Sequence, residues 1–417
     1  MKKMIIEGGK KLTGTIEISG SKNSAVALVP ASILSKGIVK IDNIPNISDI
    51  DALTEILEYL GAKVTREDKL MIIDSRSIEN KEIPESISKK LRASYYFMGA
   101  LLGKYKKVEM YFPGGCSIGE RPINLHLKGF EALGATVTNE GNRYKVEAEK
   151  LVGNKIYLDI ASVGATINIM LAATYAEGIT TIENAAREPH IVNVATFLNQ
   201  MGASIRGAGT STIKIKGVES LEGAYTEVVP DYIEAGTYVL AGALMGENLT
   251  IKNLIPSHIE SLTSKLKDMG SEFTIKSNSI TITAKETYRP VNITTAVFPG
   301  FPTDLQQPFS ILLTKCNGKS KIKETIWENR FMHIPYLEKL GAKTEINGNE
   351  VKIIGPTNLV GTEVTATDLR AGAAMILAGL TATGTTTVES IEHVLRGYEN
   401  IVEKLVNVGA KVRIEEI

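Results

Sequence analysis

One pattern of apolar and polar positions recurs along the chain. A run with apolar residues at helical spacing ends in a large apolar residue, a glycine and a small residue follow, and a stretch of alternating polarity begins. The copies are LGAKV at Leu60, LGATV at Leu133, MGASI at Met201, MGSEF at Met269, LGAKT at Leu340 and VGAKV at Val408. Their glycines are 68 to 73 residues apart, which indicates an internal repeat. A glycine there fits the left-handed backbone that ends a helix.

Two further elements precede each copy. The nearer one is a strand of alternating character, seen as VKIDNI, KVEMYF, TTIENA, LTIKNL, SKIKET and TTVES. The other is a helix rich in small and apolar residues, predicted at 21–35, 92–103, 164–176, 234–245, 304–315 and 368–382. Because these helices are apolar over most of their faces, we expect them to be buried between sheets. Each repeat is therefore predicted to contain, in this order, a helix, a strand, a second helix and two further strands.

The chain of 417 residues is longer than one hydrophobic core usually serves. Six repeats over two domains give three repeats in each, in an α/β fold. Residues 1–20 contain an extended pair, MIIEGG and GTIEISG, which we expect to complete the last repeat in space. The predicted domains are therefore 22–229, and 1–21 together with 230–417, with crossings near Gly20 and Val229.

Composition excludes several classes of function. The 47 basic and 47 acidic residues give no net charge, so no overall attraction to nucleic acid or to a membrane surface follows. The apolar runs are too short to cross a bilayer, and the first residues lack the apolar core of a signal peptide. Two cysteines far apart fit a reducing cytoplasm. The five histidines lack metal-ligand spacing, so we predict no metal and no cofactor.

Cations stand at the predicted starts of three buried helices: Lys22, Arg92 and Arg370. A helix N-terminus carries partial positive charge and free N–H groups, so it favours anions and disfavours cations. Capping explains the serine, threonine and aspartate residues at these starts, but it does not explain the cations. The mismatch indicates that these helix starts face a cleft that binds a ligand with several negative charges.

A stretch rich in glycine and proline, PGGCSIGERP at 113–122, holds Cys116 five residues before Arg121. A thiol beside a cation can be tuned for proton transfer or for nucleophilic attack. The alternative is that the two glycines form a surface turn and the cysteine is a bystander; the residues alone do not decide. This stretch is also an insertion relative to the other five repeats, and it can act as a lid.

Two other charged residues have a simple and a functional interpretation. Asp304, in GFPTDLQ, stands at a helix start, where a carboxylate is usually a cap. The rigid Phe301–Pro302 lead-in also makes it a credible general base. Arg396, in VLRGYE, fits a solvated charge at a helix end, yet Gly397 allows a loop that faces the cleft.

These motifs resemble a known enzyme family, the UDP-N-acetylglucosamine 1-carboxyvinyltransferases, which catalyse the first committed step of peptidoglycan synthesis. The resemblance covers nearly the whole chain. It rests on SKNSA, LRAS, PGGCSIGERPINLHLKG, SVGAT, ENAAREP, PGFPTDLQ, ENRFMH and ATDLRAGAA. It implies an inside-out α/β barrel fold, two domains each of three βαβαββ units, with the active site in the cleft between them. It also implies transfer of the enolpyruvyl group of phosphoenolpyruvate to the sugar 3-hydroxyl, with release of phosphate.

The resemblance also assigns roles. Cys116 would be the general acid, Asp304 the base on the sugar hydroxyl, and Lys22 and Arg396 further catalytic residues. The phosphoenolpyruvate site would consist of Lys22, Asn23, Arg121, Arg370 and Arg396. The UDP-N-acetylglucosamine site would consist of Asn23, Arg92, Arg121, Pro122, Ile123, Asn124, Leu125, Ser162, Val163, Gly164, Asp304 and Ile326. An epoxide mimic of phosphoenolpyruvate such as fosfomycin would alkylate Cys116.

The sequence departs from the family pattern at two positions. Tyr232 stands where an arginine is usual, and Leu395 precedes Arg396 where an aspartate is usual. Two other functions stay open. One is carboxyvinyl transfer to shikimate 3-phosphate, the reaction of the related EPSP synthase, which would not be expected to carry the Pro-Gly-Gly-Cys stretch. The other is a repeat-built clamp or RNA-binding protein, which the balanced charge disfavours.

Overall fold

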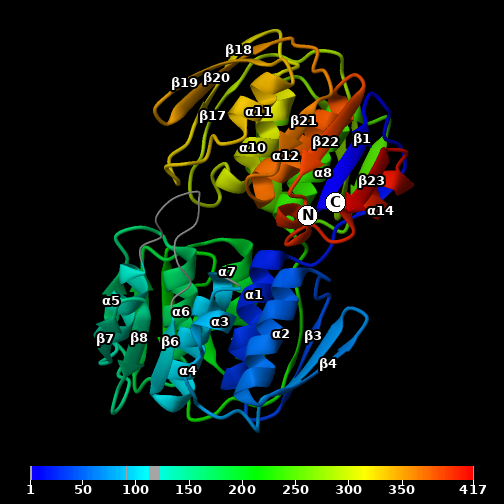
Figure 1. Cartoon of the computed structure of the whole chain (residues 1–417). Helices are drawn as coiled ribbons and strands as arrows, with labels where there is room; N and C mark the ends of the chain where they lie inside the picture. Colours follow the sequence, from blue (N-terminus) through cyan, green and yellow to red (C-terminus); the bar gives the residue numbers. More distant parts are fainter. Residues whose placement is uncertain (1, 91, 112–122, 417) are drawn as a thin grey trace. The chain divides into compact units, whose positions relative to one another are not determined.

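The computed structural model describes residues 2–90, 92–111 and 123–416, and it leaves the side chain of Arg92 undescribed (Figure 1). The chain forms two compact units. One, which we name the terminal unit, contains the residues up to Ser19 and those from Pro230 onward; the other, the middle unit, contains the described residues between Gly20 and Val229. Each unit has its own cluster of buried apolar side chains.

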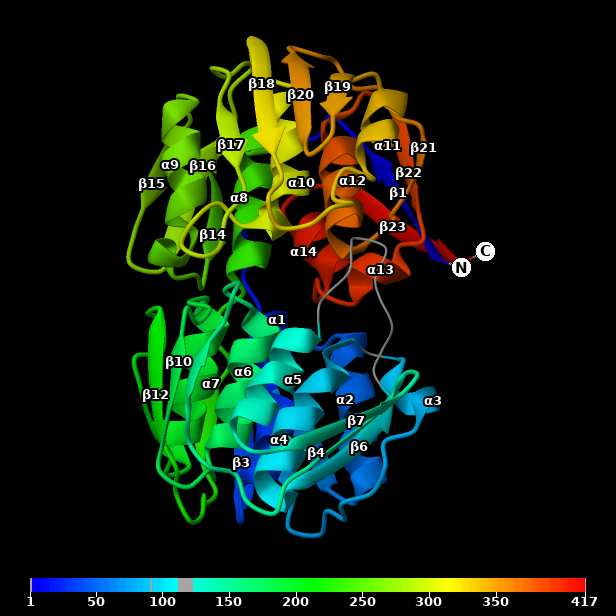
Figure 2. The ribbon, with the colours of Figure 1, turned by 90° about the vertical axis from the view of Figure 1, so that its left-hand side faces the viewer.

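Three helices form the centre of each unit, and the sheets lie around them (Figures 1 and 2). In the middle unit these are α1 (Lys22–Ala31), α4 (Tyr96–Tyr105) and α6 (Val163–Ala173). In the terminal unit they are α8 (Tyr232–Met245), α10 (Thr303–Leu313) and α12 (Leu369–Thr381). All 14 residues of α8 are buried. The prediction that the small-residue helices are buried is therefore confirmed. Gly99 in α4 shows why small residues are needed there: a Cβ at this position would lie 2.5 Å from the carbonyl oxygen of Asn168 in α6.

The second helix of each repeat ends as the glycine pattern predicts. These helices are α2 (Ser48–Leu60), α5 (Asn124–Ala132), α7 (Pro189–Gln200), α9 (Glu260–Asp268), α11 (Ile334–Lys339) and α14 (Ile401–Asn407). The glycine of every copy has a φ between 83° and 111°, so a side chain at that position would strain the backbone. The remaining described helices are short: α3 (Glu85–Ser88), α13 (Glu392–Leu395), and the 3-10 turns η1 (Ser32–Leu34), η2 (Arg92–Tyr95) and η3 (Pro256–Ile259).

The described strands form three sheets in each unit. Those of the middle unit have the orders β13-β3-β5-β4, β6-β8-β7 and β11-β12-β10-β9. Their strands are β3 (Ile38–Asp42), β4 (Lys63–Glu67), β5 (Leu70–Asp74), β6 (Lys107–Tyr111), β7 (Thr136–Glu140), β8 (Arg143–Glu147), β9 (Lys155–Tyr157), β10 (Ile179–Glu183), β11 (Ser204–Arg206), β12 (Thr212–Lys216) and β13 (Tyr225–Glu227). All six predicted alternating runs are strands, which are β3, β6 and β10 here and three more in the terminal unit.

The sheets of the terminal unit have the orders β21-β22-β1-β23, β15-β16-β14-β2 and β17-β18-β20-β19. Their strands are β1 (Lys2–Glu7), β2 (Thr15–Glu17), β14 (Leu249–Lys252), β15 (Glu272–Ile275), β16 (Ser279–Thr283), β17 (Asn292–Thr294), β18 (Gly318–Lys323), β19 (Lys343–Asn347), β20 (Glu350–Gly355), β21 (Glu363–Thr365), β22 (Thr385–Glu389) and β23 (Lys411–Glu416). The chain is thus an α/β protein built from open sheets around central helices.

The chain passes between the two units before α1 and again before α8. At these two points the first and fourth repeats exchange their short strands. In the third, fifth and sixth repeats, the short strand before a central helix pairs in parallel with the strand after that helix. The strand before α1, however, is β2, and it pairs with β14 after α8; the strand before α8 is β13, and it pairs with β3 after α1. Of the two N-terminal strands, only β1 therefore joins the last repeat, between β22 and β23. The expectation that both do so was wrong for β2, because the chain enters the middle unit directly after it.

Candidate active site

The starts of two central helices of the terminal unit, α10 and α12, meet at Asp304. Its carboxylate accepts from two guanidinium groups: Nη2 of Arg330 at 2.7 Å and Nε of Arg370 at 3.2 Å. Both arginine side chains are almost fully buried, whereas Asp304 is 27% exposed. The sequence prediction named Asp304 and Arg370 but not Arg330, which belongs to the ENRFMH motif.

Asp304 does not cap its own helix. The N-cap of α10 is Pro302, and no side chain there accepts a helix N–H. At the start of α12 the cap is Asp368, whose Oδ1 accepts from the backbone N–H of Arg370 at 2.8 Å. The simple interpretation of Asp304 is therefore wrong: its carboxylate is occupied by the two arginines and remains partly open to solvent. Two cations also favour the ionised form of a carboxylate, which is the form that can accept a proton.

Tyr398 forms a buried surface beside this cluster. The guanidinium carbon of Arg370 lies 5.3 Å from the centre of the Tyr398 ring, and the Tyr398 hydroxyl lies 2.8 Å from that of Thr237 in α8. Burial raises the pKa of Tyr398 above its ordinary value, although Arg370 acts in the opposite direction. Arg396 is half-buried and lies directly after α13, two residues before Tyr398. Because Tyr398 contacts Arg370, the segment that carries Arg396 lies beside the group around Asp304.

In the middle unit, Lys22 is the first residue of α1, and the Ser21 hydroxyl caps that helix. The ammonium nitrogen of Lys22 lies 2.6 Å from Oδ2 of Asp49 in α2, and Asp49 is almost fully buried. The sequence prediction missed Asp49 because nothing distinguishes it from other acidic residues of an amphipathic helix. Asn23 follows Lys22 and is half-buried.

The starts of α4, α5 and α6 meet at His126. Its Nδ1 lies 2.8 Å from the side-chain nitrogen of Asn168, and its ring packs edge-on against Tyr95, with ring centres 5.1 Å apart. A Cβ on Gly164 would lie 2.8 Å from the His126 ring, so only a glycine allows α6 to start there. Burial lowers the pKa of His126 to about 4, and the imidazole is therefore neutral near pH 7.

This packing brings together most of the residues predicted for UDP-N-acetylglucosamine in this unit. Ile123, Asn124 and Leu125 lie at the start of α5, immediately before His126. Ser162, Val163 and Gly164 lie at the start of α6, where the Ser162 hydroxyl accepts from the N–H of Ala165 at 3.3 Å. The backbone of Arg92 begins η2, the turn that ends at Tyr95. Cys116, Arg121 and Pro122 lie outside the described residues. Ile326, in the terminal unit, follows β18 and is half-buried.

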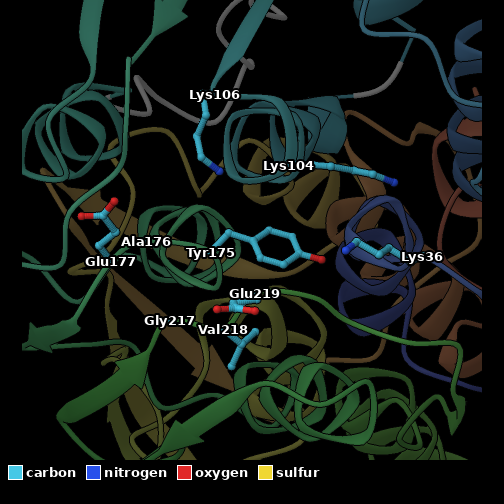
Figure 3. Close-up of a pocket in the computed structure, with 9 residues that line it drawn as sticks. All are labelled: Lys36, Lys104, Lys106, Tyr175, Ala176, Glu177, Gly217, Val218 and Glu219. Atoms are coloured by element: carbon cyan, nitrogen blue, oxygen red, sulfur yellow. The ribbon is translucent and has the colours of Figure 1, made fainter.

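The opposite ends of the middle unit's central helices carry cations for another reason. A cavity of about 430 Å³ lies there, lined by Lys36, Lys104, Lys106, Tyr175, Ala176, Glu177, Gly217, Val218 and Glu219 (Figure 3). The ammonium group of Lys104 donates to the carbonyl of Ile33 at 2.6 Å, and that of Lys106 to the carbonyl of Gly103 at 2.6 Å. Helix C-termini attract cations, so these lysines act as caps. The cations at the helix starts have no such explanation.

Within residues 2–90, 92–111 and 123–416, no group of three or more His, Cys, Asp or Glu side chains is placed to hold a metal ion. No helix in that part is both long and apolar enough to cross a membrane.

Comparison with known proteins identifies the class. The family model described as EPSP synthase (3-phosphoshikimate 1-carboxyvinyltransferase) matches residues 6–405. The chain therefore belongs to the EPSP synthase family of carboxyvinyl transferases. A solved enolpyruvyl transferase, NikO from Streptomyces tendae, has a TM-score of 0.89 and 28% identity, over 99% of this chain and 98% of that one. EPSP synthase from Acinetobacter baumannii, with a TM-score of 0.78 and 17% identity over all of both chains, shares the fold.

More similar relatives carry a narrower name. UDP-N-acetylglucosamine 1-carboxyvinyltransferase 2 of Listeria monocytogenes is 51% identical over 410 residues, which are 98% of this chain and 97% of that protein. The protein of the same name from Bacillus anthracis is 50% identical over 418 residues, which cover all of this chain and 97% of that protein.

Proposed function

We propose that this protein transfers the carboxyvinyl group of phosphoenolpyruvate to the 3-hydroxyl of UDP-N-acetylglucosamine and releases phosphate. The observation that carries this proposal is the identity of about half of all residues, over nearly the full length, with relatives named for that reaction. The Asp304 cluster is consistent with it, because it offers one ionised carboxylate within a group of cations.

The reaction needs an acid and a base. A proton from Cys116 adds to the methylene carbon of phosphoenolpyruvate, and the sugar hydroxyl gives its proton to Asp304 while its oxygen bonds to C2. The tetrahedral adduct then gives a proton from the new methyl group back to the Cys116 thiolate, the bond from C2 to the phosphate oxygen breaks, and the double bond forms again as phosphate leaves. General acid–base groups of this kind contribute about 10²- to 10⁴-fold each.

The cations hold the substrate's negative charges during these steps. We assign the phosphate and carboxylate of phosphoenolpyruvate to Lys22, Arg121, Arg370 and Arg396, with Asn23 beside them. Preorganised cations stabilise charge most strongly where water is excluded. The acceptor is assigned to the starts of α4, α5 and α6, with Arg121 and Pro122, and to Asp304 and Ile326. A lid formed by 113–122 and a cleft between the two predicted domains are parts of this proposal.

The cellular role follows from the product. A carboxyvinyl ether of UDP-N-acetylglucosamine is the first committed intermediate of peptidoglycan, so we assign the protein to cell wall biogenesis in the cytoplasm, and hence to the maintenance of cell shape and to division. We expect phosphoenolpyruvate and UDP-N-acetylglucosamine to be its partners, and we expect it to need no metal or other cofactor.

A phosphate-release assay tests the proposal. The protein is mixed with phosphoenolpyruvate and either UDP-N-acetylglucosamine or shikimate 3-phosphate, and inorganic phosphate is measured over time. We expect release with the sugar nucleotide only. The family model carries the name of the shikimate enzyme, so release with shikimate 3-phosphate alone would establish that reaction instead.

A further inference from the structure

A buried carboxylate, Glu324, lies one residue after β18. Only 2% of the residue is exposed, and within the described ranges no lysine or arginine forms an ion pair with it. Its charge is satisfied by four hydrogen bonds, donated by the hydroxyl groups of Thr295 (2.8 Å) and Thr303 (2.9 Å) and by the backbone N–H groups of Ile326 (2.8 Å) and Trp327 (3.3 Å). A carboxylate is buried at high cost unless its oxygens are bonded in this way.

The four donors come from three separate segments. Thr295 follows β17, and its hydroxyl also accepts from the N–H of Thr325 at 2.9 Å. Thr303 is the first residue of α10 and precedes Asp304. Ile326 and Trp327 belong to the loop after Glu324 itself. One side chain therefore connects the backbone of Ile326 to the start of the helix that carries Asp304.

A purely local role does not account for this arrangement. A turn stabilised by Glu324 would need only the oxygen that accepts from Ile326 and Trp327, which is Oε1. The other oxygen, Oε2, accepts from Thr303, 21 residues away in the chain. The start of α10 has no side-chain cap, so this bond is a specific tether for its first residue.

We propose that Glu324 is a positioning residue for the acceptor substrate. It holds the Ile326 loop and the start of α10 at a fixed separation, and so fixes where the sugar 3-hydroxyl lies against the Asp304 carboxylate. Glu324 touches neither substrate. The proposal rests on the proposed function, which places both Ile326 and Asp304 at UDP-N-acetylglucosamine. An error of about 1 Å in such placement can cost about 10²-fold in rate.

Three variants separate this role from simple stability. Glu324→Gln keeps one carbonyl oxygen for Thr295, Ile326 and Trp327, and its amide can donate to the Thr303 oxygen. Glu324→Ala removes every bond, whereas Thr303→Val removes only the tether to α10. Steady-state phosphate release gives kcat and the KM of each substrate, and urea unfolding reports stability.

We expect Glu324→Ala to raise the KM for UDP-N-acetylglucosamine about tenfold or more, while the KM for phosphoenolpyruvate stays within about twofold. Glu324→Gln should restore most of the loss. Thr303→Val should lower kcat about tenfold, because only the placement of Asp304 is disturbed. Thr295→Val is the control: it removes one hydroxyl from the same carboxylate, together with the bond that this hydroxyl accepts from the N–H of Thr325, but it leaves the bonds from Ile326 and Thr303 to Glu324, and it should keep kcat within about threefold.

If Glu324→Ala raises the KM values of both substrates equally, Glu324 acts through Arg330 and Arg370, and the proposal is overturned. If Glu324→Ala does not fold, Thr303→Val decides: a wild-type kcat in that variant also overturns it. If the wild type releases phosphate normally but the variants show neither the selective rise in the KM for UDP-N-acetylglucosamine nor the fall in kcat, the positioning role alone is refuted. A wild-type protein inactive with UDP-N-acetylglucosamine refutes the proposed function, and the positioning role with it.

Discussion

At the scale of single residues, Asp304 is defined by its two partners. Arg330 and Arg370 approach it from different segments, and both guanidinium groups are buried. A carboxylate held in this way has a fixed orientation and a persistent negative charge. Those properties suit a base that must meet one hydroxyl, and they explain why the residue is not used as a helix cap.

Asp304→Asn should lower kcat by about 10² to 10⁴, because an amide of nearly the same shape cannot accept the hydroxyl proton. Phosphate release at saturating substrate measures the effect. Glu345→Gln, a change at an exposed carboxylate on β19, is the control and should leave kcat unchanged. A kcat within threefold of the wild type in Asp304→Asn would remove this residue from proton transfer.

The two cysteines should differ in reactivity. Cys316 is fully buried, and burial raises its pKa to about 11, so it remains a thiol near pH 7 and cannot act as a nucleophile. Cys116 is the proposed acid. Mass spectrometry after exposure to fosfomycin should find one adduct, on Cys116. Cys316→Ser should keep the adduct and Cys116→Ala should lose it, whereas an adduct on Cys316 would contradict the assignment.

The sequence allowed part of the site to be predicted. Asp304 and Arg370 were predicted to be site residues because each is a charged residue at a predicted helix start. Arg330, Asp49, Tyr398 and Glu324 did not stand out, since their significance lies in partners 21 or more residues away. Local pattern does not encode such pairings.

At the scale of elements, the repeat was predictable because each of the six repeats contains local sequence signals for the ends of its helices and strands. The glycine after each second helix adopts the predicted left-handed backbone, and each alternating run is a strand. The placement of β2 was not predictable in the same way. Its partner β14 lies more than 230 residues away, and no local signal distinguishes joining the last repeat from joining the fourth.

The packing of α5 against α6 should make the middle unit sensitive to acid. The pKa of the His126 imidazole is 6.5 when unperturbed and about 4 in the folded chain, because of burial. The unfolded state therefore binds the proton more tightly, and the stabilising contribution is fully present above pH 6.5 and is lost as the pH falls towards 4. From these two pKa values, this group alone should remove about 2 kcal/mol between pH 7 and pH 5.

Urea unfolding of His126→Gln at pH 7 and pH 5 tests this. The glutamine does not titrate, so the variant should lose about 2 kcal/mol less than the wild type between the two pH values. His393→Gln, at a half-buried histidine of α13, serves as the comparison and should follow the wild type. Identical pH dependence in His126→Gln and the wild type would show that this histidine does not contribute to acid instability.

At the scale of the whole molecule, the exchanged strands decide which parts of the chain can fold alone. Every strand of the three middle-unit sheets lies between residues 38 and 227. The terminal unit is different, because β1 lies between β22 and β23 and β2 forms the edge beside β14. Removing residues 2–19 would leave the inner edges of β22 and β23 without their partner and would open a core that contains Met4 and Ile6.

A fragment of residues 20–229 should therefore fold on its own, whereas residues 230–417 should not. The termini offer a direct control, because β1 and β23 are antiparallel and Lys2 is paired with Glu416, so a short turn can join the end of the chain to its beginning. A single chain running from 230 to 417 and then from 1 to 19 restores both missing strands and should fold. Circular dichroism and cooperative urea unfolding measure the outcome; a cooperatively folded 230–417 fragment would show that β1 and β2 are dispensable, contrary to the topology.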